Sequence, residues 1–230
     1  MKSKGRYMFI AALILSEIMV SQNVRRFYQN GKCGYKNFVS GKIIATATYE
    51  AGSEMTNGYA LVLVANKRGY IDSTGKTIIA PQYDDAGLFC EGLAKVALNG
   101  RYGFINTLGE IIIPLKYELA DDFQDGLARV KLNGRFGFIR KDGSLAIEIK
   151  YTFAQNFAEH LAAVCENGKW GFVNTTGIFV IEAKYDSANS FNKGEALVSK
   201  KRKLFMINHK GKKLRAIEEE SEEERESGGK

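Results

Sequence analysis

The residues of this chain that come nearest to a nucleophile and its base are a cysteine and a histidine. His160 is preceded by Glu159 and followed by Cys165, so a thiol, an imidazole and a carboxylate occur within seven positions. Catalysis by such a group requires each side chain to reach the next by a hydrogen bond. His160 and Cys165 both replace ordinary residues of a repeated pattern, so we interpret them as incidental. We predict no catalytic residue and no enzyme activity.

Acidic residues gather after a recurring tyrosine, and they raise the question of a metal site. They are Asp84, Asp85, Asp121, Asp122 and Asp186. Carboxylate oxygens suit a hard cation such as Ca²⁺, but aspartates that open a helical turn are more often caps. The chain has no Gly-rich phosphate loop and no His-x-x-x-His or Cys-x-x-Cys pair. We favour caps and predict no metal and no cofactor.

Basic residues recur at two fixed positions and are the candidate binding residues. The first basic row consists of Lys67, Arg101, Arg135, Lys169 and Lys203, and the second of Lys116, Lys150 and Lys184. Stacked repeats would place such residues in line, where they can hold an extended anionic polymer in a salt-dependent way. The alternative, which we favour, is that they keep an exposed sheet soluble.

These residues recur because one stretch is repeated with a period of 34 residues. The stretch from Gly92 to Tyr117 returns at Gly126–Tyr151 and again at His160–Tyr185. The aromatic positions that keep this register, and that we expect to be structural, are Tyr83, Tyr117, Tyr151, Tyr185, Phe89, Phe123, Phe157, Phe191 and Trp170. A fixed period of this length indicates an array in which each unit packs on its neighbours.

Turn signals identify the repeat as β rather than helical. Asn99-Gly100 separates two alternating apolar runs, which is the strongest short signal for a hairpin. We therefore predict three antiparallel strands per unit, at Leu93–Leu98, Arg101–Asn106 and Glu110–Ile113. The connector Pro114–Gly126 spaces Tyr117, Ala120 and Phe123 by three, which favours a short helical turn over the sheet. The predicted fold is an all-β, elongated or curved array of such repeats.

The two ends of the chain differ from the repeats at 31–213, of which we count about five. Residues 1–21 have the basic start, apolar run and small residue of a signal peptide, and the run is too short for a membrane span. We expect export to the periplasm or cell surface, with a cytoplasmic protein as the alternative. Residues 216–230 are rich in glutamate, and we predict a disordered acidic tail. The odd count of three cysteines leaves the redox compartment open.

A short motif of a basic residue, an aromatic residue, Gly and two apolar residues occurs at Lys169-Trp170-Gly171-Phe172-Val173 and at Arg135-Phe136-Gly137-Phe138-Ile139. Each copy is followed by a Gly, an apolar strand and a Tyr-x-x-Ala-x-x-Phe run. This pattern resembles the bacterial WG-repeat (KWG-repeat) family. The resemblance covers roughly residues 31–213, although only one copy has the tryptophan. It implies an all-β repeat protein that mediates binding, and it carries over no catalytic residue.

Charge and composition complete the functional expectation. The chain has a net charge of +7 and is 45% hydrophobic, enough for a sizeable core. We predict a non-catalytic scaffold that binds a protein partner, with an anionic glycan or cell-wall polymer as the alternative ligand. The acidic tail either competes with an anionic ligand or guards the edge of the last strand. From the sequence we favour the guard, because a terminal strand is evident and a ligand is not.

Overall fold

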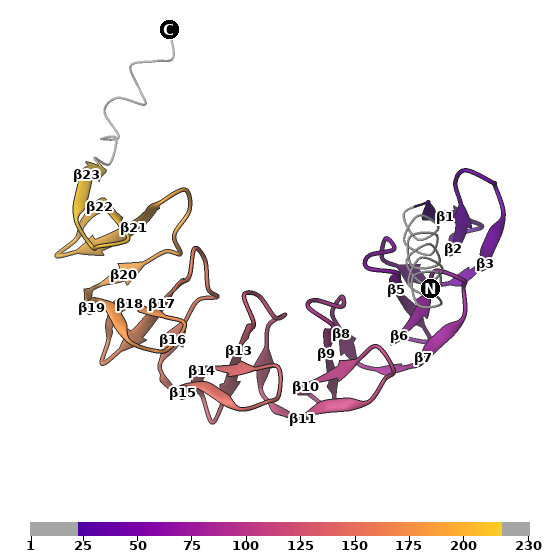
Figure 1. The fold of residues 1–230 in the computed structure, drawn as a ribbon, viewed down its shortest axis with the longest axis horizontal. Coiled ribbons are helices and arrows are strands. Elements are labelled where there is room, and N and C mark those ends of the chain that lie inside the picture. Colours follow the sequence, from indigo (N-terminus) through magenta and orange to yellow (C-terminus); the bar gives the residue numbers. More distant parts are fainter. Residues whose placement is uncertain (1–22, 218–230) are drawn as a thin grey trace, which may run out of the picture. The chain divides into compact units, whose positions relative to one another are not determined.

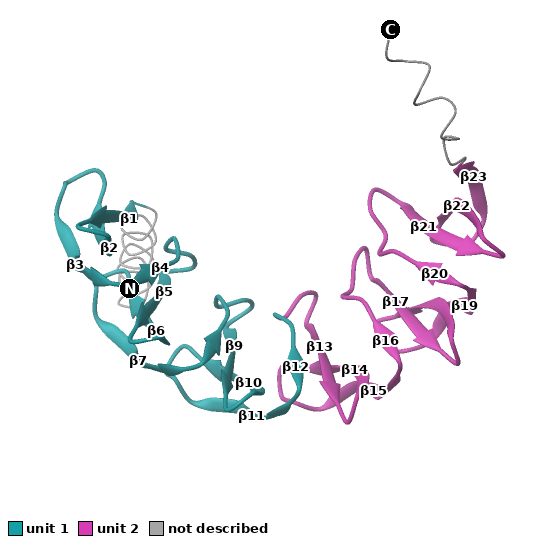
Figure 2. Ribbon diagram, turned by 180° about the vertical axis from the view of Figure 1, so that it is seen from behind, with its two compact units in different colours: residues 1–122 teal, residues 123–230 magenta. Residues whose placement is uncertain are grey.

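The computed structural model describes residues 23–217, and in this part of the chain the secondary-structure elements are all β-strands, joined by turns and loops (Figure 1). The chain divides into two compact units, residues 1–122 and residues 123–230 (Figure 2). Each unit contains consecutive antiparallel sheets in which neighbours in sequence are neighbours in space. The predicted all-β repeat fold is therefore confirmed.

Unit 1 holds three complete sheets. The first contains β1 (Val24–Gln29), β2 (Lys32–Asn37) and β3 (Ile43–Tyr49). The second contains β4 (Ala51–Gly52), β5 (Tyr59–Val64), β6 (Lys67–Asp72) and β7 (Thr77–Tyr83), and the third β8 (Asp85–Ala86), β9 (Leu93–Leu98), β10 (Arg101–Asn106) and β11 (Ile111–Tyr117). The short strand β12 (Leu119–Ala120) follows.

Unit 2 repeats the arrangement. Its strands β13 (Leu127–Leu132), β14 (Arg135–Arg140) and β15 (Leu145–Tyr151) pair in that order. The next sheet contains β16 (Phe153–Ala154), β17 (Leu161–Glu166), β18 (Lys169–Asn174) and β19 (Phe179–Tyr185). The last contains β20 (Ser187–Ala188), β21 (Glu195–Lys200), β22 (Lys203–Asn208) and β23 (Lys213–Ile217).

The predicted helical connector is wrong. Between β15 and β17 the chain bends at Thr152 and forms the two-residue strand β16, which pairs with β17. The bend resets the two-residue alternation of an extended chain, so that Tyr151, Ala154 and Phe157 are all buried despite their spacing of three. The third predicted strand of each repeat is also longer than predicted and reaches the recurring tyrosine, as β11 does at Tyr117.

The glycine after the repeated aromatic residue allows two strands to approach closely. A Cβ at Gly171 would lie 2.6 Å from the carbonyl oxygen of Ile181 and 2.7 Å from the nitrogen of Ala183, both backbone atoms of β19. The register between β18 and β19 shifts on either side of Phe172, as in a β-bulge. The aromatic-Gly motif therefore marks the point where a bulged edge strand presses against the central strand.

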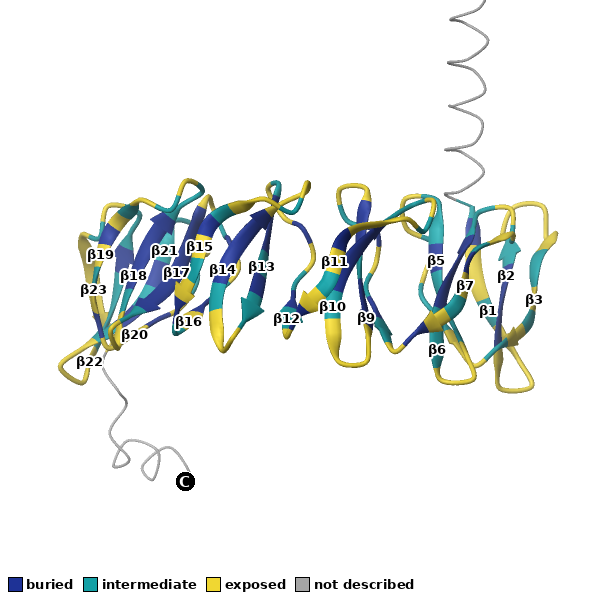
Figure 3. Cartoon of the chain, turned by 90° about the horizontal axis from the view of Figure 1, so that it is seen from below, coloured by how far each residue is buried: buried dark blue, intermediate teal, exposed yellow. Residues whose placement is uncertain are grey.

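The core consists of apolar side chains held between successive sheets of a unit. Figure 3 shows the buried residues as dark blue stretches along the strands. In unit 2, Phe138 and Ile147 of one sheet pack in a buried cluster with Val164 and Val173 of the next. The connector residue Phe157 belongs to the same cluster, and its ring centroid lies 4.8 Å from that of Phe138. Each repeat thus buries its apolar face against the following repeat, as expected of a stacked array.

The array extends beyond the predicted bounds 31–213. Strand β1 begins at Val24, and β23 runs to Ile217, two residues into the segment that we predicted to be tail. The predicted signal peptide at 1–21 and the rest of the acidic tail lie outside the described residues. No helix in residues 23–217 is long and apolar enough to span a membrane.

Candidate functional site

The first basic row is partly neutralised in unit 1. Lys67 forms an ion pair with Asp84, whose other oxygen accepts the backbone N–H of Asn99. These contacts, chiefly that with Lys67, lower the pKa of the Asp84 carboxyl. Arg101 instead points to the backbone carbonyl of Lys116, at 3.5 Å, which brings a member of each basic row together.

Within the described part of unit 2 as well, some residues of the basic rows have carboxylate partners and others do not. Lys169 pairs with Asp186 at 2.6 Å, and Lys150 pairs with Glu166 at 3.2 Å. Arg135 approaches the carbonyl of Lys150 at 3.5 Å, while Lys184 lies 5.5 Å from the ring centroid of Tyr185. Because several members already have carboxylate partners, the two rows are weaker anion sites than their spacing suggests.

The aspartates do not cap helical turns, and Asp84 and Asp186 instead join neighbouring strands by ion pairs and hydrogen bonds. Asp186 accepts the backbone N–H of Lys201 at 2.7 Å in addition to its ion pair with Lys169, and these contacts lower its pKa. Asp122 differs, because burial raises the pKa of its carboxyl and Lys95, 3.8 Å away, only partly opposes this. In residues 23–217, no group of three or more His, Cys, Asp or Glu side chains is arranged to hold a metal ion.

His160 and Cys165 are not brought together as a catalytic pair. His160 occupies a turn with a φ of 65°, and Cys165 is a buried residue near the far end of β17. Along an extended strand, a separation of five residues corresponds to about 16 Å. Glu159 instead binds His209 at 2.8 Å and the N–H of Gly194 at 3.0 Å. Burial alone raises the pKa of Glu159, but these hydrogen bonds outweigh it and lower the pKa.

All three cysteines, Cys33, Cys90 and Cys165, carry free thiols. Burial raises the pKa of the Cys33 thiol and of the Cys90 thiol. A raised pKa suppresses the thiolate, which is the reactive form. These two residues are therefore small apolar parts of the fold.

Two positions of the repeat, half a period apart, carry residues in unit 1 that are linked by polar contacts. Arg68 forms an ion pair with Asp85 at 3.2 Å, and the hydroxyl of Tyr102 donates a hydrogen bond to Asp85 at 3.1 Å. These residues are spaced by 17, half the period. Two successive sheets are thus linked at their margin by a chain of polar contacts.

The equivalent positions in unit 2 all carry aromatic rings. Phe136, Phe153 and Trp170, which we name the aromatic row, are again spaced by 17. Phe153 stacks on Phe136 with ring centroids 6.5 Å apart and on Trp170 with centroids 6.3 Å apart. Trp170 also packs against the core of unit 2, whereas Phe153 is 58% exposed.

Cationic side chains border the aromatic row. Arg129 lies 5.4 Å and Lys131 5.5 Å from the ring centroid of Phe136, and Arg129 is fixed by a hydrogen bond to the carbonyl of Ala154. The electrostatic attraction between a cation and a ring face holds such side chains in place. Sequence reasoning missed this surface because it followed the period of 34, whereas the row follows half of it.

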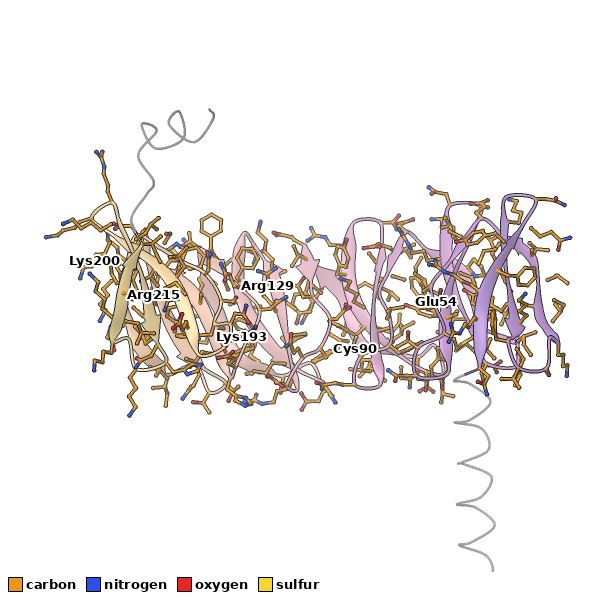
Figure 4. The ribbon with its side chains drawn as sticks, turned by 90° about the horizontal axis from the view of Figure 1, so that it is seen from above. Glu54, Cys90, Arg129, Lys193, Lys200 and Arg215 are labelled. Atoms are coloured by element: carbon orange, nitrogen blue, oxygen red, sulfur yellow. The ribbon has the colours of Figure 1, made fainter. Side chains whose placement is uncertain are left out.

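Charge separates the two units as well. Residues 123–217 contain seventeen Lys and Arg against eight Asp and Glu, a net of +9, whereas residues 23–122 contain eleven against ten, a net of +1. Figure 4 shows the side chains, with Arg129 and Lys200 of unit 2 labelled. The excess of positive charge therefore belongs to the same unit as the aromatic row.

Comparisons with known proteins agree with this architecture. A search of curated proteins gives no match. Among solved structures, a eukaryotic initiation factor is similar with a TM-score of 0.56 and 12% identity, over 84% of this chain and 61% of that chain. Hsv2p of Kluyveromyces lactis is similar with a TM-score of 0.46 and 13% identity, over 83% of this chain and 72% of that one. The likeness to the initiation factor concerns the fold alone.

The family comparison is more specific. The model described as "WG containing repeat" matches four consecutive segments, residues 69–102, 102–136, 136–170 and 170–203. The segments meet at Tyr102, Phe136 and Trp170, the aromatic residues that precede the glycine of each repeat. Together they cover more than half of the chain. This chain belongs to the WG containing repeat family.

Proposed function

We propose that this β-repeat module is a non-catalytic scaffold that binds a protein partner through the aromatic row of unit 2. The observation that carries the proposal is the exposure of Phe153 between two stacked rings. A phenylalanine at this position is not required by the fold, since Asp85 occupies the same position in unit 1. Aromatic side chains and arginine are enriched where proteins bind one another, and clustered aromatics dominate the binding energy.

The position of the row supports this function. Phe136 and Trp170 are half-buried and anchored by the sheets, so the row is rigid before a partner binds. A rigid platform loses little conformational entropy on binding. Arg129 and Lys131 would then select a partner with acidic residues around an apolar centre.

The test compares two exposed apolar residues of unit 2. Ile178 is 65% exposed in the turn before β19 and is not part of the aromatic row. We expect that a partner captured by the wild-type chain is also captured by Ile178→Ser, and that Phe153→Ser weakens its binding at least tenfold, as for a binding hot spot. Capture is followed by titration with the purified partner. Equal binding by both variants would exclude the row as the interface.

The second candidate is a module for an anionic glycan or cell-wall polymer. The observation that favours it is the net charge of +9 in residues 123–217. Retention on heparin that disappears at moderate salt, without loss in Phe153→Ser, supports this candidate. Binding of a protein partner that persists at high salt supports the first. We also propose export, which the N-terminal residue of the mature protein tests directly.

A further inference from the structure

The hairpin between β21 and β22 carries an unusual turn. Its tip, which we name the basic tip, is Lys200–Lys203. Lys201 and Arg202 have φ values of 51° and 61°, in the left-handed region that favours Asn and Gly. The other two hairpins of this kind in unit 2 place Asn133-Gly134 and Asn167-Gly168 at these positions. Two long basic side chains thus occupy a turn that disfavours them.

The charges at the basic tip are also arranged unfavourably. Lys200 and Lys203 are directly paired across the two strands, and like charges opposite each other destabilise a sheet. Within the described part of the chain, the four side chains of the tip form no ion pair. The nearby Asp186 attracts Lys200 electrostatically but forms no ion pair with it, and its oxygens accept hydrogen bonds from Lys169 and from the backbone N–H of Lys201.

The strand register places the last described residue of the chain next to this tip. In the last sheet, Leu204 of β22 is paired with Ile217 of β23. The described chain therefore ends at Ile217, one residue pair away from Lys203 at the basic tip. The segment 218–226, which contains seven glutamates, is thus attached to the chain at the end of the sheet that carries the basic tip.

We propose that the basic tip is an anion-binding site whose built-in occupant is the acidic segment 218–226. Strain and like-charge repulsion at the tip are features that a structural hairpin would avoid, and binding of carboxylates relieves the repulsion. Because the tail is tethered beside the site, its local concentration is high. An external polyanion must therefore displace it. The proposal concerns a different surface from the aromatic row and does not depend on the protein-binding function.

The test measures how deletion of the tail couples to the basic tip. The probe is inorganic polyphosphate, titrated at low salt into the full chain and into a chain that ends at residue 217. We expect deletion to tighten polyphosphate binding about tenfold, since it removes a tethered competitor. The variant Lys201→Asn with Arg202→Gly restores the common turn and is expected to fold at least as stably. In that background, deletion should change the affinity about twofold or less, because the site is gone.

A matched control removes the same charge elsewhere in the same sheet. Lys210 and Lys212 are exposed in the turn between β22 and β23, at the end of the sheet opposite to the basic tip. Lys210→Ser with Lys212→Ser should leave the tenfold effect of deletion intact. An equal effect of deletion in both double variants would mean that the tail acts only through net charge. Absence of polyphosphate binding to the truncated chain would mean that the tip is not an anion site.

A direct measurement complements the titration. Zero-length crosslinking of carboxylates to amines in the full chain should join glutamates of 218–226 to Lys200, Lys201 or Lys203. Crosslinks that reach mainly Lys210, Lys212 and Lys213 would overturn the proposal. So would an unchanged polyphosphate affinity on deletion accompanied by aggregation, which would leave the tail as a guard of the β23 edge.

Discussion

At the scale of single residues, two phenylalanines of one connector in unit 2 have different roles, one in the core and one in the proposed binding surface. Phe157 is buried and packs against Phe138, as Phe191 packs against Phe172 in the next sheet with centroids 4.8 Å apart. Phe153, four residues earlier, is exposed and stacks in the aromatic row. The same residue type therefore has two functions, and burial separates them.

We expect Phe157→Ala to lower the free energy of unfolding by about 3–5 kcal/mol, the usual result of emptying a buried aromatic site. Phe153→Ala should lower it by about 1 kcal/mol, because it removes only stacking at the surface. Urea denaturation of the two variants measures both values. Equal losses would mean that Phe153 is a core residue, and this would also weaken the proposed binding function.

At the scale of elements, the pairing of β18 with β19 requires a glycine at position 171, because there is no room for a side chain between the two strands. A Cβ at Gly171 meets backbone atoms of β19, whereas a Cβ at Gly168, in the hairpin turn before β18, meets no atom within 4 Å. Gly168 has a φ of 74° and is needed for its conformation instead. The two glycines of one repeat therefore meet different physical requirements.

Substitution by alanine should separate these requirements. Gly171→Ala forces β19 away from β18, at a cost of about 1–3 kcal/mol or more, and we expect faster amide hydrogen exchange in Phe179–Tyr185. Gly168→Ala strains a turn by about 1–2 kcal/mol. Apart from this global loss of stability, it should not speed up amide hydrogen exchange in β19. If Gly171→Ala kept β19 fully protected, the close approach of the two strands would not be what requires the glycine.

At the scale of the whole molecule, carboxylates that accept hydrogen bonds in the folded chain make stability depend on pH. Hydrogen bonds lower the pKa of Asp84, Asp142, Asp186 and Glu195, from Lys67, Ser144, Lys169 and Arg215 respectively. A carboxyl whose pKa is lower in the folded than in the unfolded chain stabilises the fold above its unfolded pKa. This contribution is lost as the pH falls through the folded value.

We expect the melting temperature to be nearly constant from about pH 8 to pH 5 and to fall below about pH 4, where free carboxyl groups titrate. Asp122 opposes this slightly, because burial raises its pKa. Asp186→Asn should melt at a lower temperature than the wild type at neutral pH, and the difference should shrink below about pH 4. Circular dichroism at several pH values measures it, and a constant difference at all pH values would contradict the role of the carboxylate charge.

The sequence alone was sufficient for the features that depend on nearby residues. Asn99-Gly100 and its counterparts identify the hairpins, because turn geometry and the alternation of side chains depend on residues close together in the chain. The period of 34 identifies the stacked repeats. The connector was misassigned for the same reason. A spacing of three at Tyr151, Ala154 and Phe157 fits both a helical turn and a bent extended chain, and only pairing of β16 with β17 distinguishes them.

Contacts between repeats required the tertiary structure. The aromatic row joins Phe136 of one sheet to Phe153 and Trp170 of the next, and neither the pairing of Lys169 with Asp186 nor that of Lys150 with Glu166 follows from spacing. The basic residues at 200–203 are plain in the sequence, but their left-handed backbone and the pairing of Leu204 with Ile217 are not. Which side chains meet depends on strand register and on the packing of one sheet on another, because both are set by long-range contacts that no local pattern records.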